Sequence, residues 1–283
     1  MDDQAERLRQ LVKKWEQRRK KRIIAITSGK GGVGKTNIAV NLALVLCEWG
    51  HKVTLLDADL GLANVDIVMG INPPRTLSQV VRGECKLTDI VYSVHGIKVI
   101  AGGSGLEELA MLPESEIMYL FQDAAQINSD FFVIDTGAGL SSQVISMALA
   151  AEEVLVVTTP EPTSLTDAYA LIKVLVRQKR DLILYLVVNR VTNNKEAEQI
   201  TANFCQVVKD FLAANVNYLG YIPEDRLVKT AVTRQQPLLL TFPSAPASQK
   251  LRAIAAALSG ANPSLASRDG LGGFWGRLRS LLS

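Results

Sequence analysis

The stretch SGKGGVGKT, residues 28–36, decides the fold of this chain. It follows the apolar run RIIAITS, residues 22–28, and opens a long helix-like stretch. Its glycines let backbone N–H groups turn toward phosphate oxygens, and the N-terminus of the following helix adds partial positive charge. The pattern G-x-x-x-x-G-K-[ST] predicts a lysine that reaches the β- and γ-phosphates and a hydroxyl that holds Mg²⁺. The fixed positions of the pattern are filled by Gly29, Gly34, Lys35 and Thr36.

Short β-branched runs alternate with helix-like stretches from residue 22 to residue 260. Most runs are continuously apolar, which is typical of strands buried on both faces of a parallel sheet. The alternation predicts one α/β domain, a doubly wound and mostly parallel sheet flanked by helices. The predicted strands cover residues 22–28, 52–59, 97–103, 131–136, 153–159, 182–189 and 216–223. The predicted helices cover residues 36–49, 114–127, 141–151, 163–179, 195–213 and 245–258.

The composition favours a packed protein over a disordered one, because hydrophobic residues make up 48% of the 283 residues and charged residues 21%. Cys47, Cys85 and Cys205 have no metal-ligand spacing, which predicts reduced thiols and excludes the paired cysteines of an iron–sulfur ATPase. No apolar run reaches the roughly 18 residues of a membrane span. The charged stretch from Met1 to Arg22 is not a secretory signal. We therefore expect a cytoplasmic protein.

The two ends of the chain are basic, while its body is mildly acidic. Residues 1–22 hold nine Lys and Arg against four Asp and Glu, and residues 263–283 hold three Arg against one Asp. A basic end can contact lipid or nucleic acid, but a short run of charge is as often simply solvated. Charge alone leaves both interpretations open.

Three aspartates stand at the carboxyl ends of predicted strands, where open α/β sheets bind ligands. Asp57 and Asp59 end one strand, and as alternate residues of an extended chain they face the same side. Asp135 ends another strand, and Gly137 and Gly139 after it predict a switch loop that senses the γ-phosphate. Each aspartate alone could be a helix cap or a turn residue. Three of them beside a phosphate-binding loop predict a Mg²⁺ and phosphate site.

Lys30 is a second lysine inside the glycine loop, and one nucleotide does not need it. With Lys30, the sequence KGGVGKT resembles the deviant Walker A motif of the MinD/ParA ATPases, and the resemblance spans about residues 22–260. It implies an ATP-dependent homodimer in which Lys30 reaches the partner's phosphates, because a lysine supplied in trans stabilises γ-phosphate charge only when two subunits meet. The resemblance implies ATP binding through Gly29, Lys30, Gly31, Gly32, Val33, Gly34, Lys35 and Thr36.

The same resemblance assigns the chemistry of hydrolysis. Asp59 is implied to orient the attacking water, in a reaction that depends more on positioning than on a strong base. Lys30 and Lys35 would stabilise phosphate charge beside it. The implied holders of Mg²⁺, the aspartates acting through water, are Thr36, Asp57 and Asp135.

Three later motifs match the family around the nucleoside. Asn189 in VVNR matches the adenine-reading residue, since its amide has the donor and the acceptor that adenine requires. Pro223 in GYIPED matches the loop on the other side of the base. TPEPTSLTDAY places Glu161 near the ribose and Asp167 on the surface used by activating partners, although both are also ordinary residues for the start of a helix.

Residues 1–21 include DQAERLR, which resembles the DQAxxLR element of the FlhG family, also called YlxH or FleN. These MinD-like ATPases set flagellar number and placement. The resemblance implies that the segment stimulates the GTPase FlhF, with Gln4 reaching the nucleotide site and Asp3, Leu8 and Arg9 in support. It also implies the flagellar C-ring proteins FliM and FliN as cargo. The alternative is an ordinary amphipathic helix folded onto the body.

Residues 261–269 predict a flexible linker, and residues 270–283 carry an apolar face. On a helical wheel, six apolar residues fall within an arc of about 120°, flanked by arginines. This pattern favours a helix that lies in the interface of an anionic membrane and is mostly unfolded in water, since three glycines oppose helix formation. The alternative is a last helix docked on the body. The predicted membrane residues are Phe274, Trp275, Arg277, Leu278, Leu281 and Leu282.

Taken together, these features predict a slow ATPase that dimerises with ATP, associates with the inner face of the cell membrane and controls flagella. The MinD septum-site ATPases are the close alternative, although such chains start almost at the first strand. A ParA-type partition ATPase would need basic residues spread over the dimer face, so we expect no nucleic acid. The predicted parts are residues 1–21 as activator segment, 22–260 as ATPase domain, 261–269 as linker and 270–283 as membrane helix.

Overall fold

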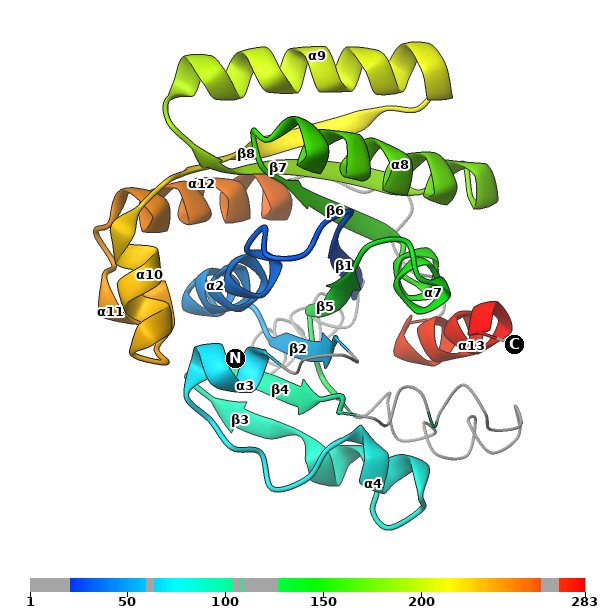
Figure 1. Ribbon diagram of the computed structural model, residues 1–283. Coiled ribbons are helices and arrows are strands. Elements are labelled where there is room, and N and C mark those ends of the chain that lie inside the picture. The colour runs from blue at the N-terminus through cyan, green and yellow to red at the C-terminus, as the bar shows by residue number, and fades with distance from the viewer. Residues whose placement is uncertain (1–20, 60–63, 104–107, 109–126, 261–269, 283) are drawn as a thin grey trace, which may run out of the picture.

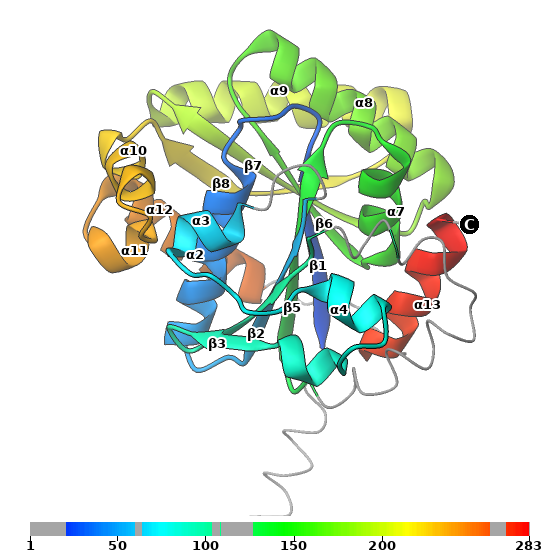
Figure 2. The same ribbon diagram turned by 60° about the horizontal axis from the view of Figure 1, so that its bottom comes forward.

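The computed structural model describes residues 21–59, 64–103, 108, 127–260 and 270–282. These residues form one eight-stranded sheet in the order β3-β4-β2-β5-β1-β6-β7-β8 (Figures 1 and 2). Every neighbouring pair is parallel except the edge pair β3 and β4, which is antiparallel. The strands are β1 (Arg22–Ser28), β2 (Val53–Ala58), β3 (Tyr92–Val94), β4 (Ile97–Ala101), β5 (Phe131–Ala138), β6 (Glu153–Thr158), β7 (Ile183–Val191) and β8 (Val216–Pro223).

Helices cover both faces of the sheet. One face carries α4, the 3-10 helix η1, α7, α8, α9 and α13, and the other carries α2, α3, α10, α11 and α12 (Figure 1). The helices are α2 (Lys35–Glu48), α3 (Val65–Met69), α4 (Leu77–Val81), η1 (Leu87–Ile90), α7 (Ser142–Ala150), α8 (Pro162–Gln178), α9 (Asn194–Leu212), α10 (Arg226–Thr233), α11 (Leu238–Thr241), α12 (Pro246–Gly260) and α13 (Gly270–Leu282).

The apolar strands are buried because each of their two faces packs on a helical layer. In β1, Ile23 and Ala25 join the core under α7 and α8, while Ile24 and Ile26 join the core under α2 and α12. This arrangement confirms the predicted doubly wound, mostly parallel sheet. The sequence reading missed β3, because its three residues are largely exposed and its pattern is too short to separate from a turn.

The parallel strands bring the predicted functional segments to one edge of the sheet. The glycine loop follows β1, the Asp57–Asp59 turn ends β2, and the loop after Asp135 ends β5. Asn189 lies near the end of β7, and Pro223 ends β8. The order β2-β5-β1-β6-β7-β8 therefore places all of these loops side by side at the carboxyl ends of neighbouring strands.

At the opposite end of β1, a basic residue is buried rather than solvated. Arg22 is 8% exposed, and its Nε donates to Glu153 Oε1 at 2.8 Å. Its Nη1 donates to the carbonyl of Leu258 at 2.6 Å, near the end of α12. The charge of Arg22 is therefore neutralised inside the fold and does not belong to the basic N-terminal surface.

Helix α13 lies against α7 on the body of the protein (Figures 1 and 2). Its apolar face packs into the core, where Leu271, Phe274, Trp275 and Leu278 are at most 2% exposed. The ring of Phe274 lies 6.1 Å from that of Phe132 in β5. The expectation that this segment is mostly unfolded in water does not hold in this structure, because the body supplies the apolar surface that the glycine-rich helix lacks on its own.

Two polar contacts hold the same helix. The Ser146 hydroxyl of α7 donates to the carbonyl of Leu281 at 2.9 Å, and Arg277 Nε donates to the carbonyl of Ala150 at 3.0 Å. Arg277 Nη2 also lies 3.6 Å from Glu152 Oε1, within ion-pair distance. Within the described residues, no helix is long and apolar enough to span a membrane. The helix predicted at residues 114–127 lies, except for Ile127, outside the described residues.

Candidate nucleotide-binding and catalytic site

The loop between β1 and α2 depends on three glycines for different reasons. Gly32 and Gly34 have φ of 75° and 95°, in the left-handed region that favours glycine. A Cβ on Gly29 would lie 2.2 Å from the carbonyl carbon of Asp167, so the backbone of α8 packs directly on the loop. The loop therefore receives its shape from β1, α2 and α8 together. Asp167, predicted to meet activating partners, is half-buried at this contact.

A cavity of about 1230 Å³ opens beside this loop and is large enough for a nucleotide. The glycine loop with the start of α2, helix α3, the ends of β7 and β8, and helix α10 all line it. The predicted site residues that line the cavity are Gly31, Gly32, Gly34, Lys35, Thr36, Asp59, Asn189 and Pro223.

Lys35 begins α2 with its side chain inside the site. It is 7% exposed, and burial lowers the pKa of its ammonium, while Asp135 and Asp59 act to raise it. A buried cation between carboxylates at the N-terminus of a helix is suited to bind phosphate oxygens. This position agrees with the predicted role of Lys35.

Asp135 tests whether the site fits Mg²⁺. It is fully buried at the end of β5, and burial raises the pKa of its carboxyl to about 7, with a smaller rise from Asp57 and a lowering from the Thr36 hydroxyl and Lys35. Neither carboxylate oxygen has a hydrogen-bond partner of regular geometry among the described residues. A buried carboxylate next to the Thr36 hydroxyl is what a hydrated Mg²⁺ needs. The residues present therefore fit the cation that the sequence predicts.

The carboxylate of Asp57 accepts hydrogen bonds from backbone N–H groups in this structure. Its Oδ2 accepts hydrogen bonds from the N–H groups of Asn64 and Val65, both at 3.1 Å, and its Oδ1 accepts one from Asp59 at 3.2 Å. Burial raises the pKa of this carboxyl to about 6, against the three N–H groups, which lower it. Asp57 thus fixes the start of α3 to the end of β2. Its contribution to Mg²⁺ binding stays a prediction.

Asp59 lies next to the loop that follows β5. A Cβ on Gly137 would be 3.6 Å from Asp59 Oδ1, which is ordinary van der Waals contact, and 3.2 Å from Val144 Cγ2 in α7. Asp59 and Lys35 both line the cavity. The structure therefore brings the predicted water-orienting aspartate and the predicted γ-phosphate switch into contact.

Both the donor and the acceptor of the Asn189 side-chain amide form hydrogen bonds with the protein backbone. Its Nδ2 donates to the carbonyl of Val33 at 2.8 Å, and its Oδ1 accepts from the backbone N–H of Arg190 at 3.0 Å. A Cβ on Gly34 would lie 2.5 Å from Nδ2, so the amide packs directly on the glycine loop. Recognition of adenine by Asn189 stays a prediction, and it requires this amide to exchange partners.

Lys30 is held by its own subunit. Its Nζ lies 2.8 Å from Glu161 Oε2 and 3.3 Å from Thr163 Oγ1, at the start of α8. The hydrogen bond and the charge of Lys30 lower the pKa of Glu161, and Arg190 adds to this effect. Both side chains of the ion pair are about half exposed, so solvent screens the contact and Lys30 can leave it at little cost. The ribose contact predicted for Glu161 stays a prediction.

Sequence reasoning missed two parts of the cavity. Arg190 contacts the glycine loop, with Nη2 donating to the carbonyl of Gly32 at 2.9 Å, and its only sequence signal is its position after Asn189. The α10 wall was also missed, although Asp225 caps that helix by accepting from Leu227 N–H at 2.9 Å and its motif was visible. The α10 side chains that line the cavity are Arg226, Val228, Lys229, Thr230, Val232 and Thr233.

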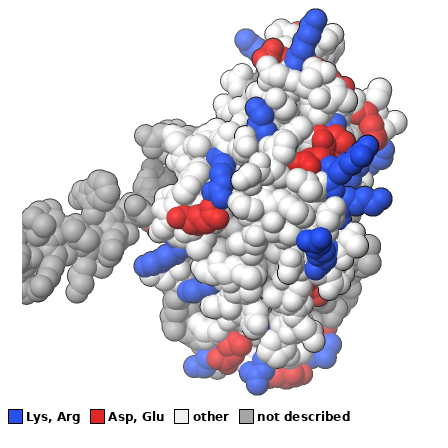
Figure 3. Space-filling view, turned by 90° about the vertical axis from the view of Figure 1, so that its left-hand side faces the viewer, with Lys and Arg blue, Asp and Glu red and all other residues white. Residues whose placement is uncertain are grey.

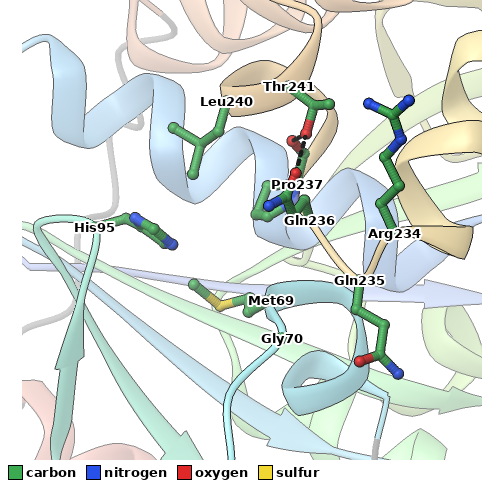
Figure 4. A pocket seen from close by; sticks show the side chains of 9 residues that line it. All are labelled: Met69, Gly70, His95, Arg234, Gln235, Gln236, Pro237, Leu240 and Thr241. Atoms are coloured by element: carbon green, nitrogen blue, oxygen red, sulfur yellow. Dashed lines mark hydrogen bonds between the residues drawn. The ribbon is translucent and has the colours of Figure 1, made fainter.

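A second cavity, of about 490 Å³, is lined by residues from the end of α3, the turn between β3 and β4, the connection from α10 to α11, and α11 (Figure 4). Met69, His95, Pro237 and Leu240 surround it in the close view, while the guanidinium of Arg234 points away from its centre. It contains none of the predicted site residues. The nearby packing is tight, because a Cβ on Gly70 would lie 2.5 Å from the carbonyl oxygen of Gln235.

The predicted membrane residues whose side chains the structure describes do not line the nucleotide cavity. Phe274, Trp275 and Leu278 are buried between α13 and the body, Arg277 contacts the end of α7, and Leu281 is 37% exposed. The membrane contact of these residues is not tested by their position. Asp3, Gln4, Leu8, Arg9 and the side chain of Leu282 are outside the described residues.

Comparison with known proteins identifies the family. A ParA family profile, described as the NUBPL iron-transfer P-loop NTPase, matches residues 19–259. The antiactivator FleN of Pseudomonas aeruginosa is 42% identical over 236 residues, which cover 82% of this chain and 84% of FleN. The flagellum site-determining protein YlxH of Helicobacter pylori is 38% identical over 241 residues, covering 84% of this chain and 81% of YlxH. The chain belongs to the FleN/YlxH group of MinD/ParA ATPases.

A solved structure supports the fold and the activity of this group. The septum site-determining protein MinD of Pyrococcus horikoshii, complexed with Mg-ADP, matches with a TM-score of 0.69 and 30% identity over 85% of this chain and 96% of MinD. The chain is a P-loop ATPase with a MinD-like fold. The cavity beside the glycine loop is therefore its candidate nucleotide site.

Proposed function

We propose that this FleN/YlxH-type ATPase is a nucleotide-switched dimer that associates with the membrane and controls the number and placement of flagella. The single observation that carries the proposal is Lys30, which stands on the open face of an otherwise complete ATPase site. The ammonium of Lys30 contacts Glu161, and Lys30 is not among the residues that line the cavity, whereas Lys35 is. The names of the relatives FleN and YlxH supply the biological process.

Hydrolysis follows from the residues around the cavity. The glycine loop and Lys35 bind the phosphates, and Mg²⁺, held at Thr36 and Asp135, would neutralise phosphate charge when bound. Asp59 orients a water beside the switch glycine Gly137. Because these residues position the reactants and supply no strong base, turnover is slow and the nucleotide acts as a timer.

Dimerisation requires Lys30 to change partners. In the single subunit Lys30 is paired with Glu161, and in the dimer it leaves this pair to reach the γ-phosphate of the facing subunit. The exchange is favourable only when a triphosphate faces it, because a buried phosphate attracts the ammonium more strongly than a solvated carboxylate does. The nucleotide state thus sets the oligomeric state.

Membrane association depends on α13. Its lipid-binding face, Phe274, Trp275 and Leu278, is the same face that packs on α7, so the helix binds either the body or the lipid. Release exposes an apolar stripe edged by Arg277 and Arg279, which suits an anionic interface. Two released helices in one dimer bind far better than one, because the second binds at high effective concentration.

Residues 1–21 connect the switch to flagellar assembly. Their DQAERLR element is proposed to stimulate an FlhF-like GTPase through Gln4, with FliM and FliN as further partners. The alternative of a MinD-type septum ATPase rests on the shared fold and on 30% identity to MinD. The FleN and YlxH relatives, at 42% and 38% identity, favour the flagellar assignment.

A ParA-type DNA-binding function is the weaker alternative. On the side that carries α10, α11 and α12, the described lysines and arginines stand among acidic and uncharged residues, and these described residues form no continuous basic patch (Figure 3). Arg252 on this face is paired with Glu48. Continuous basic surface is the electrostatic requirement for binding DNA without sequence preference.

The proposed function is tested by Asp59→Ala in the full chain. The variant should bind ATP with wild-type affinity and dimerise with it, and should lose hydrolysis by at least about 100-fold, because only the orientation of the water is removed. Calorimetry, light scattering and phosphate release measure the three properties. Undiminished turnover would remove Asp59 from the reaction.

A further inference from the structure

Strand β7 ends in a bulge next to the nucleotide cavity. Asn189 pairs with Ile222 and Val191 pairs with Pro223, so Arg190 is an extra residue without a partner position on β8. Its φ is 60°, in the left-handed region that arginine rarely adopts. Bulges beside active sites often redirect a side chain, and such backbone outliers cluster at functional sites.

The redirected side chain holds the glycine loop. Arg190 Nη2 donates to the carbonyl of Gly32 at 2.9 Å, and Asn189 Nδ2 donates to the carbonyl of Val33 at 2.8 Å. Two consecutive residues of β7 thus bind two consecutive carbonyls of the loop. Because these carbonyls are turned toward β7, the neighbouring N–H groups stay available to phosphate.

We propose that Arg190 is a positioning residue for the nucleotide. It holds loop residues 31–34 in their phosphate-binding shape before the nucleotide arrives, and the bulge in β7 aims it at Gly32. Arg190 acts through the loop and not on the reacting atoms. Its charge is partly balanced by Glu161, so the effect depends on the hydrogen bond to Gly32 more than on attraction to phosphate.

The variant Arg190→Asn separates the side chain from the backbone conformation. Asparagine tolerates a left-handed φ better than most residues, so the bulge keeps its shape, but its short side chain cannot reach the Gly32 carbonyl. Arg190→Lys keeps the charge and one donor. Arg226→Asn is the matched control, because Arg226 lines the same cavity from α10 and the substitution removes the same charge.

The first measurement is hydrogen exchange of the backbone amides of residues 31–34 in the nucleotide-free protein. The second is the affinity for ADP and for ATP by calorimetry. Arg190→Asn should speed hydrogen exchange in the loop and lower the affinity for both nucleotides by about tenfold, which is the loss expected for one charge-assisted hydrogen bond. The melting temperature and kcat at saturating ATP should remain close to wild type. Arg190→Lys should recover part of the affinity. Arg226→Asn should leave the exchange of residues 31–34 at the wild-type rate, whatever the loss of its charge does to affinity.

Two results would overturn the proposal. Wild-type exchange and affinity in Arg190→Asn would mean that the hydrogen bond to Gly32 does not shape the loop. Equally fast loop exchange in Arg226→Asn would mean that the charge of the cavity, and not the hydrogen bond to Gly32, shapes the loop. A loss of kcat at saturating ATP with unchanged affinity would also contradict it, since Arg190 would then act in the chemical step.

Discussion

The hydrogen bond from Ser146 to Leu281 offers a direct test of whether the docked helix α13 is the membrane anchor. Ser146 lies on α7 and is 4% exposed, so Ser146→Ala removes the bond without touching the lipid-binding face of α13. A neutral hydrogen bond of this kind contributes about 1 kcal/mol. Docking should weaken by that amount, because Leu281 lies near the end of α13 and water can replace the lost donor.

The size of the effect follows from the docking equilibrium. A change of about 1 kcal/mol raises the fraction of released helix about fivefold. While the docked form dominates, the apparent affinity for lipid rises by the same factor, because only the released form binds. The nucleotide-free variant should therefore bind anionic liposomes about fivefold more tightly than the wild type.

The assay is co-sedimentation with liposomes of anionic phospholipid, without nucleotide. Ser248→Ala is the matched control, because Ser248 is also buried and donates to a backbone carbonyl, that of Phe242 at 2.7 Å, but lies in α12, away from α13. The control should lose stability without a gain in lipid binding. Unchanged or weaker lipid binding in Ser146→Ala would refute the competition between body and membrane, and so would an equal gain in the control.

Four further outcomes are expected. Because burial raises the pKa of Asp135 to about 7, binding of Mg-ADP should release close to one proton from this carboxyl at pH 6 and about a tenth of a proton at pH 8. Calorimetry in buffers of different ionisation enthalpy measures this release. Asp135→Asn should release no proton from this position. Because of the same raised pKa, the folded protein binds more protons than the unfolded chain between about pH 4 and 7. The contribution of Asp135 to the free energy of unfolding should therefore fall as the pH rises through that range. In Asp135→Asn the melting temperature should fall less with pH than in the wild type. Glu161→Gln should shift ATP-dependent dimerisation slightly to lower protein concentration, because it removes the ion pair that retains Lys30, and solvent already screens that pair. A shift to higher concentration would mean that Glu161 is needed in the dimer, for example at the ribose. A peptide of residues 1–22 should raise the GTPase rate of a cognate FlhF, and the same peptide with Gln4→Ala should not. Equal rates with both peptides would favour the alternative that the protein is a MinD-type septum-site ATPase.

The predictable parts of this protein are those in which the signal is local. The glycine loop, Lys35 and Asp135 could be assigned because each occupies a fixed position next to an apolar strand, and parallel strands must gather their carboxyl ends at one edge. The sequence pattern also located the apolar face of α13. It could not say what covers that face, since α7 lies more than 100 residues earlier in the chain.

The contacts that escaped prediction join distant segments. The pairing of Lys30 with Glu161 and of Arg190 with Gly32 depends on how β6 and β7 are ordered beside β1, which no periodicity shows. The three backbone N–H groups that donate to Asp57 could not be predicted either, because two of them come from the start of α3, and the predicted role of Asp57 at Mg²⁺ stays a prediction. Sequence patterns therefore identified the chemical groups, and the three-dimensional arrangement identified their partners within the protein.

The mass of the protein in solution with ATP tests the central claim most directly. In the Asp59→Ala background, which prevents hydrolysis, light scattering should give the 30.8 kDa monomer with ADP and twice that mass with ATP. Adding Lys30→Ala should leave ATP bound and return the mass to the monomer. A dimer that forms with ATP in the absence of Lys30, or a monomer with ATP in its presence, would contradict the nucleotide-switched dimer.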